Sequence, residues 1–146
     1  MPHTALLSIL ENPKVMIELL KLYPGCLVIA DNDGKILWAN DAFEELTGYS
    51  ILEVRGLKPK DFLHGPDTDP ETIEYMSSKR KQGLPFEAEI LNYRKDGSGY
   101  WIYLKAVPIY IDGELKFWVA NKYPLATKEA FAEQLDKIAK LVEKLS

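Results

Sequence analysis

The chain has 146 residues, of which 47% are hydrophobic and 27% charged, and this composition suits a single globular domain with one core. Its formal net charge of −4 argues against a nucleic-acid partner, because binding to a phosphate backbone requires a basic face. No apolar run approaches the ~20 residues of a membrane-spanning helix, and the N-terminus lacks the cationic segment and cleavage site of a signal peptide. Cys26 is the single cysteine, which excludes an internal disulfide and a thiolate metal cluster, so we expect a cytoplasmic location.

The first 40 residues predict a helix followed by a hairpin. Asn12 and Pro13 are typical of a helix start, because Asn caps free amides and proline has no amide hydrogen to leave unpaired. The Tyr-Pro-Gly stretch at 23–25 ends that helix. Two short apolar runs then flank the Asn-Asp-Gly turn at 32–34, which predicts a β-hairpin.

Short helices are predicted in the middle of the chain. Residues 41–48 follow a capping Asn40, and residues 50–56 form another brief turn. A longer helix over 70–82 begins after Asp69, since Pro70 suits the first helical position.

The C-terminal part changes to a period of two, which predicts strands. Three strands cover residues 86–94, 100–111 and 115–123, and a last helix covers 127–146. The short turns between the strands can join only antiparallel neighbours. We therefore predict an α+β fold with a five-stranded antiparallel sheet, short helices on one of its faces, and a helix at each end.

Alternation along the strands divides their side chains between two faces. The inner face, expected under the central helices, takes Ile90, Asn92, Ile102, Leu104, Phe117, Val119 and Asn121. The outer face takes Leu91, Tyr93, Trp101, Tyr103, Val107, Trp118 and Ala120. Because the outer face is aromatic as well, we expect the terminal helices, a second copy of the chain, or both to cover it.

The last helix carries an apolar seam whose members are spaced alternately by four and three residues, as in a coiled coil. The seam consists of Phe131, Leu135, Ile138, Val142 and Leu145. Two heptads are too few to hold a dimer alone. The seam therefore either extends a dimer made by the sheets or lies back on the sheet.

Several motifs in consistent order resemble a PAS domain across residues 24–124. They are CLVIADNDGKILWANDAFEELTGYS, FLHGPDTDPET and NYRKDGSGYWIYLKAVPI, followed by the closing strand. The resemblance divides the chain into an N-terminal helical cap at 1–23, a PAS core at 24–124, and a C-terminal signalling helix at 125–146. FLHGPDTD and LNYRKDG are typical of the LOV-like branch, which implies a PAS fold with a ligand or cofactor between the sheet and the short helices.

The chain departs from the LOV pattern on the helical side of the expected pocket. Lys60 stands where that branch has its photoactive cysteine, and Pro59 replaces the asparagine before it. His64 replaces a glutamine, and Pro70 replaces an arginine that holds the flavin phosphate.

On the strands the resemblance is partial as well. Asn92 is kept, Ile102 replaces a second asparagine, and Asn121 stands near the place of a glutamine in the last strand. An adduct with flavin needs a thiolate, which an ammonium does not replace. Ile102 would leave part of a buried flavin edge unmatched, at roughly 1–3 kcal/mol per group. We therefore predict no LOV-type FMN adduct and no cofactor, with a differently held flavin such as FAD as one alternative and a haem bound by His64 as another.

If a small molecule does bind, we expect His64, Asn92 and Asn121 to orient it, although the two asparagines could instead bond each other. The apolar walls would come from Ile90, Ile102, Leu104, Phe117 and Val119. We find no metal set and no pair of nucleophile and base, so we expect no enzyme activity.

The favoured function is a regulatory sensor and dimerisation module of a signal-transduction protein. The resemblance implies a homodimer that controls an output domain such as a histidine kinase or a cyclase. Two alternatives stay open: a flavin- or haem-bound redox or gas sensor, and a constitutive dimerisation scaffold without a ligand.

Overall fold

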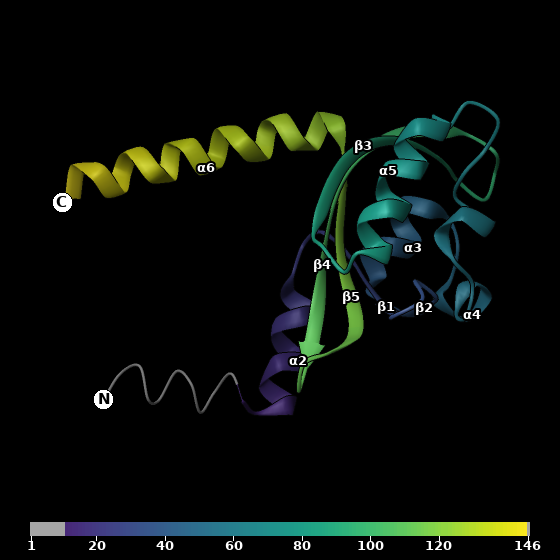
Figure 1. Ribbon diagram of the computed structural model, residues 1–146. Coiled ribbons are helices and arrows are strands. Elements are labelled where there is room, and N and C mark those ends of the chain that lie inside the picture. The colour runs from purple at the N-terminus through teal and green to yellow at the C-terminus, as the bar shows by residue number, and fades with distance from the viewer. Residues whose placement is uncertain (1–10, 146) are drawn as a thin grey trace.

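The computed structural model describes residues 11–145 (Figure 1). Its strands are β1 (Cys26–Asp31), β2 (Ile36–Ala39), β3 (Phe86–Tyr93), β4 (Gly99–Ile111) and β5 (Glu114–Pro124). Its helices are α2 (Pro13–Leu22), α3 (Asp41–Thr47), α4 (Ile51–Val54), η1 (Pro59–Asp61), α5 (Pro70–Lys81) and α6 (Leu125–Leu145). In the described part of the chain, no helix is both long and apolar enough to span a bilayer.

The five strands form one antiparallel sheet in the order β2-β1-β5-β4-β3. The predicted five-stranded sheet is therefore confirmed. In Figure 1, α3, α4 and α5 lie on one side of the sheet, while α2 lies on the other side. The first hairpin and the last two strands are thus joined through the middle of the sheet, where β1 pairs with β5.

The predicted helix starts are present in the structure. The side chain of Asn12 accepts a hydrogen bond from Lys14 N–H at 2.9 Å, and that of Asp69 accepts one from Glu71 N–H at 3.0 Å. Ser50 and Glu53 form a reciprocal capping box around α4. These caps fix where each short helix begins and hence how it lies over the sheet.

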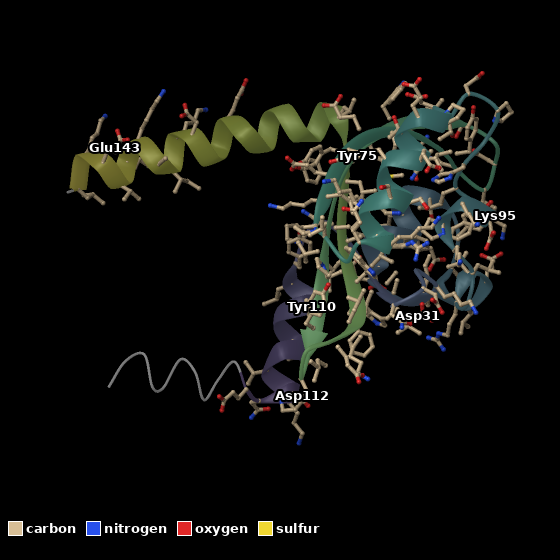
Figure 2. All side chains as sticks on the ribbon, in the orientation of Figure 1. Asp31, Tyr75, Lys95, Tyr110, Asp112 and Glu143 are labelled. Atoms are coloured by element: carbon tan, nitrogen blue, oxygen red, sulfur yellow. The ribbon has the colours of Figure 1, made fainter. Side chains whose placement is uncertain are left out.

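The hairpin between β4 and β5 contains one extra residue on β5. At the turn, Ile111 lies opposite Glu114 and Tyr110 lies opposite Leu115, but Ile109 lies opposite Phe117. Lys116 therefore has no partner across the hairpin, which makes this position a β-bulge. Figure 2 shows Asp112 at the tip of this hairpin, where its φ of 51° belongs to a tight turn.

The bulge reverses the two faces of β5 relative to the prediction. Continued without it, the turn register would pair Leu104 with Asn121, but Leu104 lies opposite Lys122. Residues directly opposite each other share a face, so a shift of one residue turns every β5 side chain to the other side. The inner face of β5 therefore consists of Trp118, Ala120 and Lys122. The predicted inner positions of Phe117, Val119 and Asn121, and the outer positions of Trp118 and Ala120, are wrong.

The outer face of the sheet is covered only in part by the chain itself. At one end the Tyr23 hydroxyl, just after α2, donates a hydrogen bond to Asn121 Oδ1 at 2.6 Å. Elsewhere Trp101 is 52% exposed, and the outer-face residues Ile109 and Phe117 are also exposed. The rings of Tyr103 and Tyr123 pack together on this face, with centroids 5.2 Å apart and planes tilted by 38°. Intramolecular cover by α2 is thus real, but it leaves a large apolar surface open.

Tyr93, predicted for this outer face, serves a local contact instead. It is half-buried, and its hydroxyl accepts a hydrogen bond from the N–H of Asp67 at 3.1 Å. The ring therefore braces the loop before α5 at the edge strand β3.

Helix α6 leaves the sheet and projects away from it in Figure 1, and Figure 2 shows Glu143 far from the strands. Ile138, Val142 and Leu145 of the predicted seam are exposed, while the side chains of Phe131 and Leu135 lie outside the described ones. The option that the seam lies back on the sheet does not hold for the described part of α6. A coiled coil with a second chain stays a prediction.

The bulge predicts the effect of a single deletion. Removing Lys116 would restore an unbulged hairpin and turn Trp118 and Lys122 outward, with Phe117 and Asn121 inward. We expect the deletion to lower the free energy of unfolding by about 3 kcal/mol or more, the scale of losing one large core side chain. Urea unfolding followed by circular dichroism measures this.

Lys116→Ala is the matched control, because it removes the same side chain and keeps the residue count. We expect it to change the stability by less than about 0.5 kcal/mol, as for an ordinary surface substitution. Equal stability of the deletion variant and the control would contradict the account of the register.

Candidate functional site

A cavity of about 280 Å³ lies between the inner face of the sheet and the elements η1 and α5. This volume is at the lower end of the range for small-molecule sites. The apolar part of its lining comes from several strands and from α5. These residues are Val28, Ala30, Ile36, Ile73, Met76, Phe86, Ile90, Leu104, Ala106, Trp118 and Ala120.

Polar groups from three separate segments also face the cavity. Asn92 comes from β3, His64 from the loop after η1, and Lys122 from β5. Alternation along the strand explains the contributions of β3 and β5, because every second side chain of a strand points to the same face of the sheet. His64 follows Leu63, which is fully buried and anchors the loop against the core.

Three of the cavity's buried polar atoms have no hydrogen-bond partner among the described residues. They are His64 Nδ1, Asn92 Oδ1 and Trp118 Nε1. Buried polar atoms are usually paired, because an unmet donor or acceptor costs roughly 1–3 kcal/mol. The three residues that carry these unmet atoms all line one cavity, which favours a ligand with complementary polar groups.

Tyr100 lies opposite Asn92 in the register of β3 and β4. Burial raises the pKa of its hydroxyl to about 12, and the neighbouring Asn92 side chain partly offsets that rise. The two side chains are close, yet neither Asn92 Oδ1 nor the Tyr100 hydroxyl is in a hydrogen bond of normal geometry. Asn92, which lines the cavity, thus keeps its acceptor unpaired among the described residues.

Lys122 is the most unusual residue of the site. It is only 4% exposed, and burial lowers the pKa of its ammonium below the usual range, while the nearby Cys26 acts in the opposite direction. No hydrogen bond or ion pair joins it to another described residue. A lysine is almost never buried without a partner, so this position calls for an explanation.

Burial also keeps the two titratable neighbours of Lys122 uncharged near neutral pH. It lowers the pKa of His64 to about 4, with a further contribution from the charge of Lys122. It raises the pKa of the Cys26 thiol to about 11, against a lowering effect of Lys122. The interior of the cavity therefore offers dipoles and one potential cation, but no anion.

Charged side chains lie at the rim of the cavity, on the turn of the first hairpin, on η1 and on α5. The cationic ones are Lys58, Lys60 and Arg80, and the anionic ones are Asp33 and Glu74. Three cations in one rim suit an anionic group that extends from a ligand in the cavity toward solvent.

The structure brings together only part of the predicted ligand-binding set. Of that set, the cavity is lined by His64, Ile90, Asn92 and Leu104. Ile102 is fully buried but does not line it. Asn121 bonds Tyr23 on the opposite face, so it orients no ligand and makes no bond to Asn92. Phe117 and Val119 lie on that outer face as well and form no cavity wall.

Of the buried residues with a polar group that line the cavity, Trp118 and Lys122 were not predicted from the sequence. Their signal was the hairpin register, because both fall on the inner face only if β5 has one residue more than β4. Among the described residues, no three His, Cys, Asp or Glu side chains are grouped so as to hold a metal ion.

Comparison with known proteins identifies the family. A family model described as a PAS domain matches residues 24–121, which is more than half of the chain. The chain belongs to the PAS domain family. Within it the chain resembles LOV domains: it is similar to the LOV domain of a blue-light-activated histidine kinase from Erythrobacter litoralis, with a TM-score of 0.66 and 32% identity over 70% of this chain and 96% of that one.

A second solved structure, named for a flavin analogue in a light-oxygen-voltage domain, matches this PAS domain with a TM-score of 0.70 and 28% identity. It covers 86% of this chain and 95% of the other. The predicted PAS fold is therefore confirmed, including its LOV-like character.

Two curated relatives are also blue-light proteins. A blue-light-activated histidine kinase from Brucella anthropi is 36% identical over 106 residues, which are 72% of this chain and 21% of the relative. A blue-light photoreceptor from Listeria monocytogenes is 31% identical over 135 residues, 90% of this chain and 53% of the relative. The PAS domain thus spans about a fifth to a half of the length of these relatives.

These relatives correct the prediction about cofactors. A pocket without cofactor, and the absence of a LOV-type FMN adduct, are contradicted by kinship with blue-light receptors and with a flavin-associated LOV structure. The physical arguments against flavin also fail. Ile102 is not in the cavity wall, and the cations Lys58, Lys60 and Arg80 lie at the rim although Pro70 supplies none.

The burial of Lys122 predicts a stabilising substitution. Because the unfolded chain holds a proton on this lysine more readily than the folded one, the stability of the ligand-free protein rises with pH up to the unfolded pKa of about 10.4. We expect Lys122→Met to raise the free energy of unfolding at pH 7 by about 1–3 kcal/mol and to remove this slope.

Urea unfolding between about pH 7 and pH 8.5 measures both effects, since His64 titrates below and Cys26 above this window. Lys105→Met, an exposed lysine on the outer face of β4, is the control. A Lys122→Met protein that is less stable than the control at every pH would contradict the assigned burial cost.

Proposed function

We propose that this PAS domain is a flavin-binding sensor module that regulates an attached or associated signalling output. The observation that supports it most is that three residues lining one cavity each carry a buried polar atom without a hydrogen-bond partner among the described residues. Kinship with blue-light receptors favours a flavin over other ligands.

The polar groups of the cavity fit the edge of a flavin ring. The pyrimidine part of an isoalloxazine carries two carbonyl oxygens, ring nitrogens and one N–H. Asn92 Oδ1 is an acceptor for the N–H, while Trp118 Nε1–H and the Lys122 side chain are donors for the oxygens and nitrogens. Neutral His64 serves as donor or acceptor, according to its tautomer.

The remaining parts of the cavity fit the rest of the ligand. Apolar residues of β1, β4 and α5 would contact the faces of the ring. Lys58, Lys60 and Arg80 at the rim would hold the phosphate end of a flavin nucleotide. Bound flavin supplies absorption of blue light and reversible uptake of electrons.

Strand β5 connects the cavity to both terminal helices. Lys122 faces the cavity, the adjacent Asn121 bonds Tyr23 after α2, and α6 begins at Leu125 directly after the strand. A change around Lys122 would therefore alter strand packing and the direction of α6. We propose that this is how a change at the ligand reaches an output domain such as a histidine kinase.

We further propose that the module acts as a homodimer and has no enzyme activity of its own. The exposed apolar residues Trp101, Ile109 and Phe117 on the outer face favour contact with a second copy. The exposed apolar residues of α6 would continue that contact beyond the sheet.

A spectrum and a tryptophan substitution test the flavin proposal. We expect purified protein supplied with FMN to show bound-flavin absorption after gel filtration. Trp118→Phe should weaken FMN binding about fivefold to tenfold, because it removes one net hydrogen bond worth ~1 kcal/mol and keeps the ring. Quenching of FMN fluorescence measures the dissociation constant.

Trp38→Phe is the matched control, since Trp38 is on β2 and does not line the cavity. Its affinity should equal that of the wild type. A colourless protein that fails to bind added FMN, FAD or riboflavin would overturn the proposed function.

Trp101→Glu tests the dimer. We expect it to weaken self-association at least tenfold, because it places a charge on the open outer face. The control is Leu52→Glu, which changes an even more exposed apolar residue on α4, on the helical side of the sheet. Analytical ultracentrifugation measures both; a wild-type monomer at high micromolar concentration would contradict the dimer.

A further inference from the structure

Lys122 lies at the centre of the sheet rather than at an edge. Its neighbours in the register are Leu104 on β4 and Cys26 on β1, so strands cover it on both sides. It lines the cavity described above and also a second cleft beneath α3. The side chain is only 4% exposed, and its charge acts on both His64 and Cys26.

The described groups that face Lys122 form no ion pair with it. From β1, Cys26 stays a neutral thiol because its pKa is raised to about 11. From the loop after η1, His64 stays a neutral imidazole because its pKa is lowered to about 4. From α3, Glu45 lines the second cleft together with Lys122, but no ion pair joins the two.

The other charged groups of the cavity lie at its rim and balance one another in part. They are Asp33, Glu74, Lys58, Lys60 and Arg80. In the ligand-free protein the ammonium form of Lys122 is therefore disfavoured by desolvation without compensation. A ligand that brings carbonyl oxygens or a negative charge to this side chain reverses the balance, because it favours the ammonium.

We propose that Lys122 is the ionisable anchor of the ligand site, and that binding of a flavin charges it by uptake of one proton from solvent. The inference rests on the proposed flavin function. It adds that binding is coupled to proton uptake and that β5 contacts the pyrimidine end of the ring. The proton goes from water to Lys122 Nζ, and no other bond forms or breaks.

This coupling makes flavin affinity depend on pH in a defined direction. Between the pKa of Lys122 in the free site and its higher value in the occupied site, affinity falls by up to tenfold for each pH unit of increase. Neither Cys26 nor His64 contributes between about pH 6.5 and pH 8.5. The dependence therefore belongs to Lys122 and vanishes when its amine is removed.

Isothermal titration calorimetry of the full 146-residue chain tests this. Riboflavin is the probe, because it lacks the phosphate whose own titration near pH 6 would add protons. Runs in two buffers of different ionisation enthalpy give the number of protons taken up per riboflavin. We expect wild type and Lys105→Met to take up a measurable fraction of one proton more than Lys122→Met.

The possible results separate the inference from the function on which it rests. Riboflavin binding with the same proton number in wild type and Lys122→Met overturns the proton coupling and leaves the flavin proposal standing. No riboflavin, FMN or FAD binding by the wild type overturns both.

A second measurement uses the wild type alone and does not depend on the variant being folded. Carbon-13 at the Cε atoms of lysine reports protonation of each amine by NMR. We expect one lysine, Lys122, to titrate well below the others in the free protein and at a higher pH with riboflavin bound. An unmoved titration midpoint on binding overturns the inference.

Discussion

The register of the β4–β5 hairpin is the constraint on which the site depends. One unpaired residue, Lys116, lies between the turn and the rest of the β4–β5 pairing. It decides which of the alternating β5 side chains face the helices. With the bulge, Trp118 and Lys122 enter the cavity and Asn121 faces outward. Without it, an amide and two apolar side chains would take their places, and the cavity would lose the buried amine of Lys122.

Strand β5 contacts both the ligand cavity and the segments that lead to the terminal helices. Alternate residues of β5 face the cavity and the outer surface, and the outer ones include Asn121, which holds the end of α2 through Tyr23. Since α6 continues from the last residue of β5, both terminal helices depend on one strand. A sensor built in this way needs no long pathway, because an altered contact at Lys122 lies within three residues of α6.

Much of the fold was predictable because it is encoded locally. Period-two patterns, Gly-containing turns and the caps at Asn12 and Asp69 specify the strands and helices. On β3 and β4 the alternation also placed Asn92 and Leu104 on the cavity side. On β5 it failed, because a bulge shifts register without changing composition. Lys122 was not predicted as a cavity residue, because a charged residue is rarely assigned to a core. The prediction of no cofactor was wrong because it relied on single positions such as Ile102.

The central claim is that Trp118 faces the ligand cavity while the chain's other two tryptophans do not. Indole N–H resonances in a nitrogen-15 NMR spectrum test it directly, because the chain has three tryptophans, Trp38, Trp101 and Trp118. Addition of FMN should shift the Trp118 resonance, assigned by its loss in Trp118→Phe, and leave the other two nearly unchanged. A shift of the Trp101 resonance with Trp118 unmoved would show that the ligand meets the opposite face of the sheet.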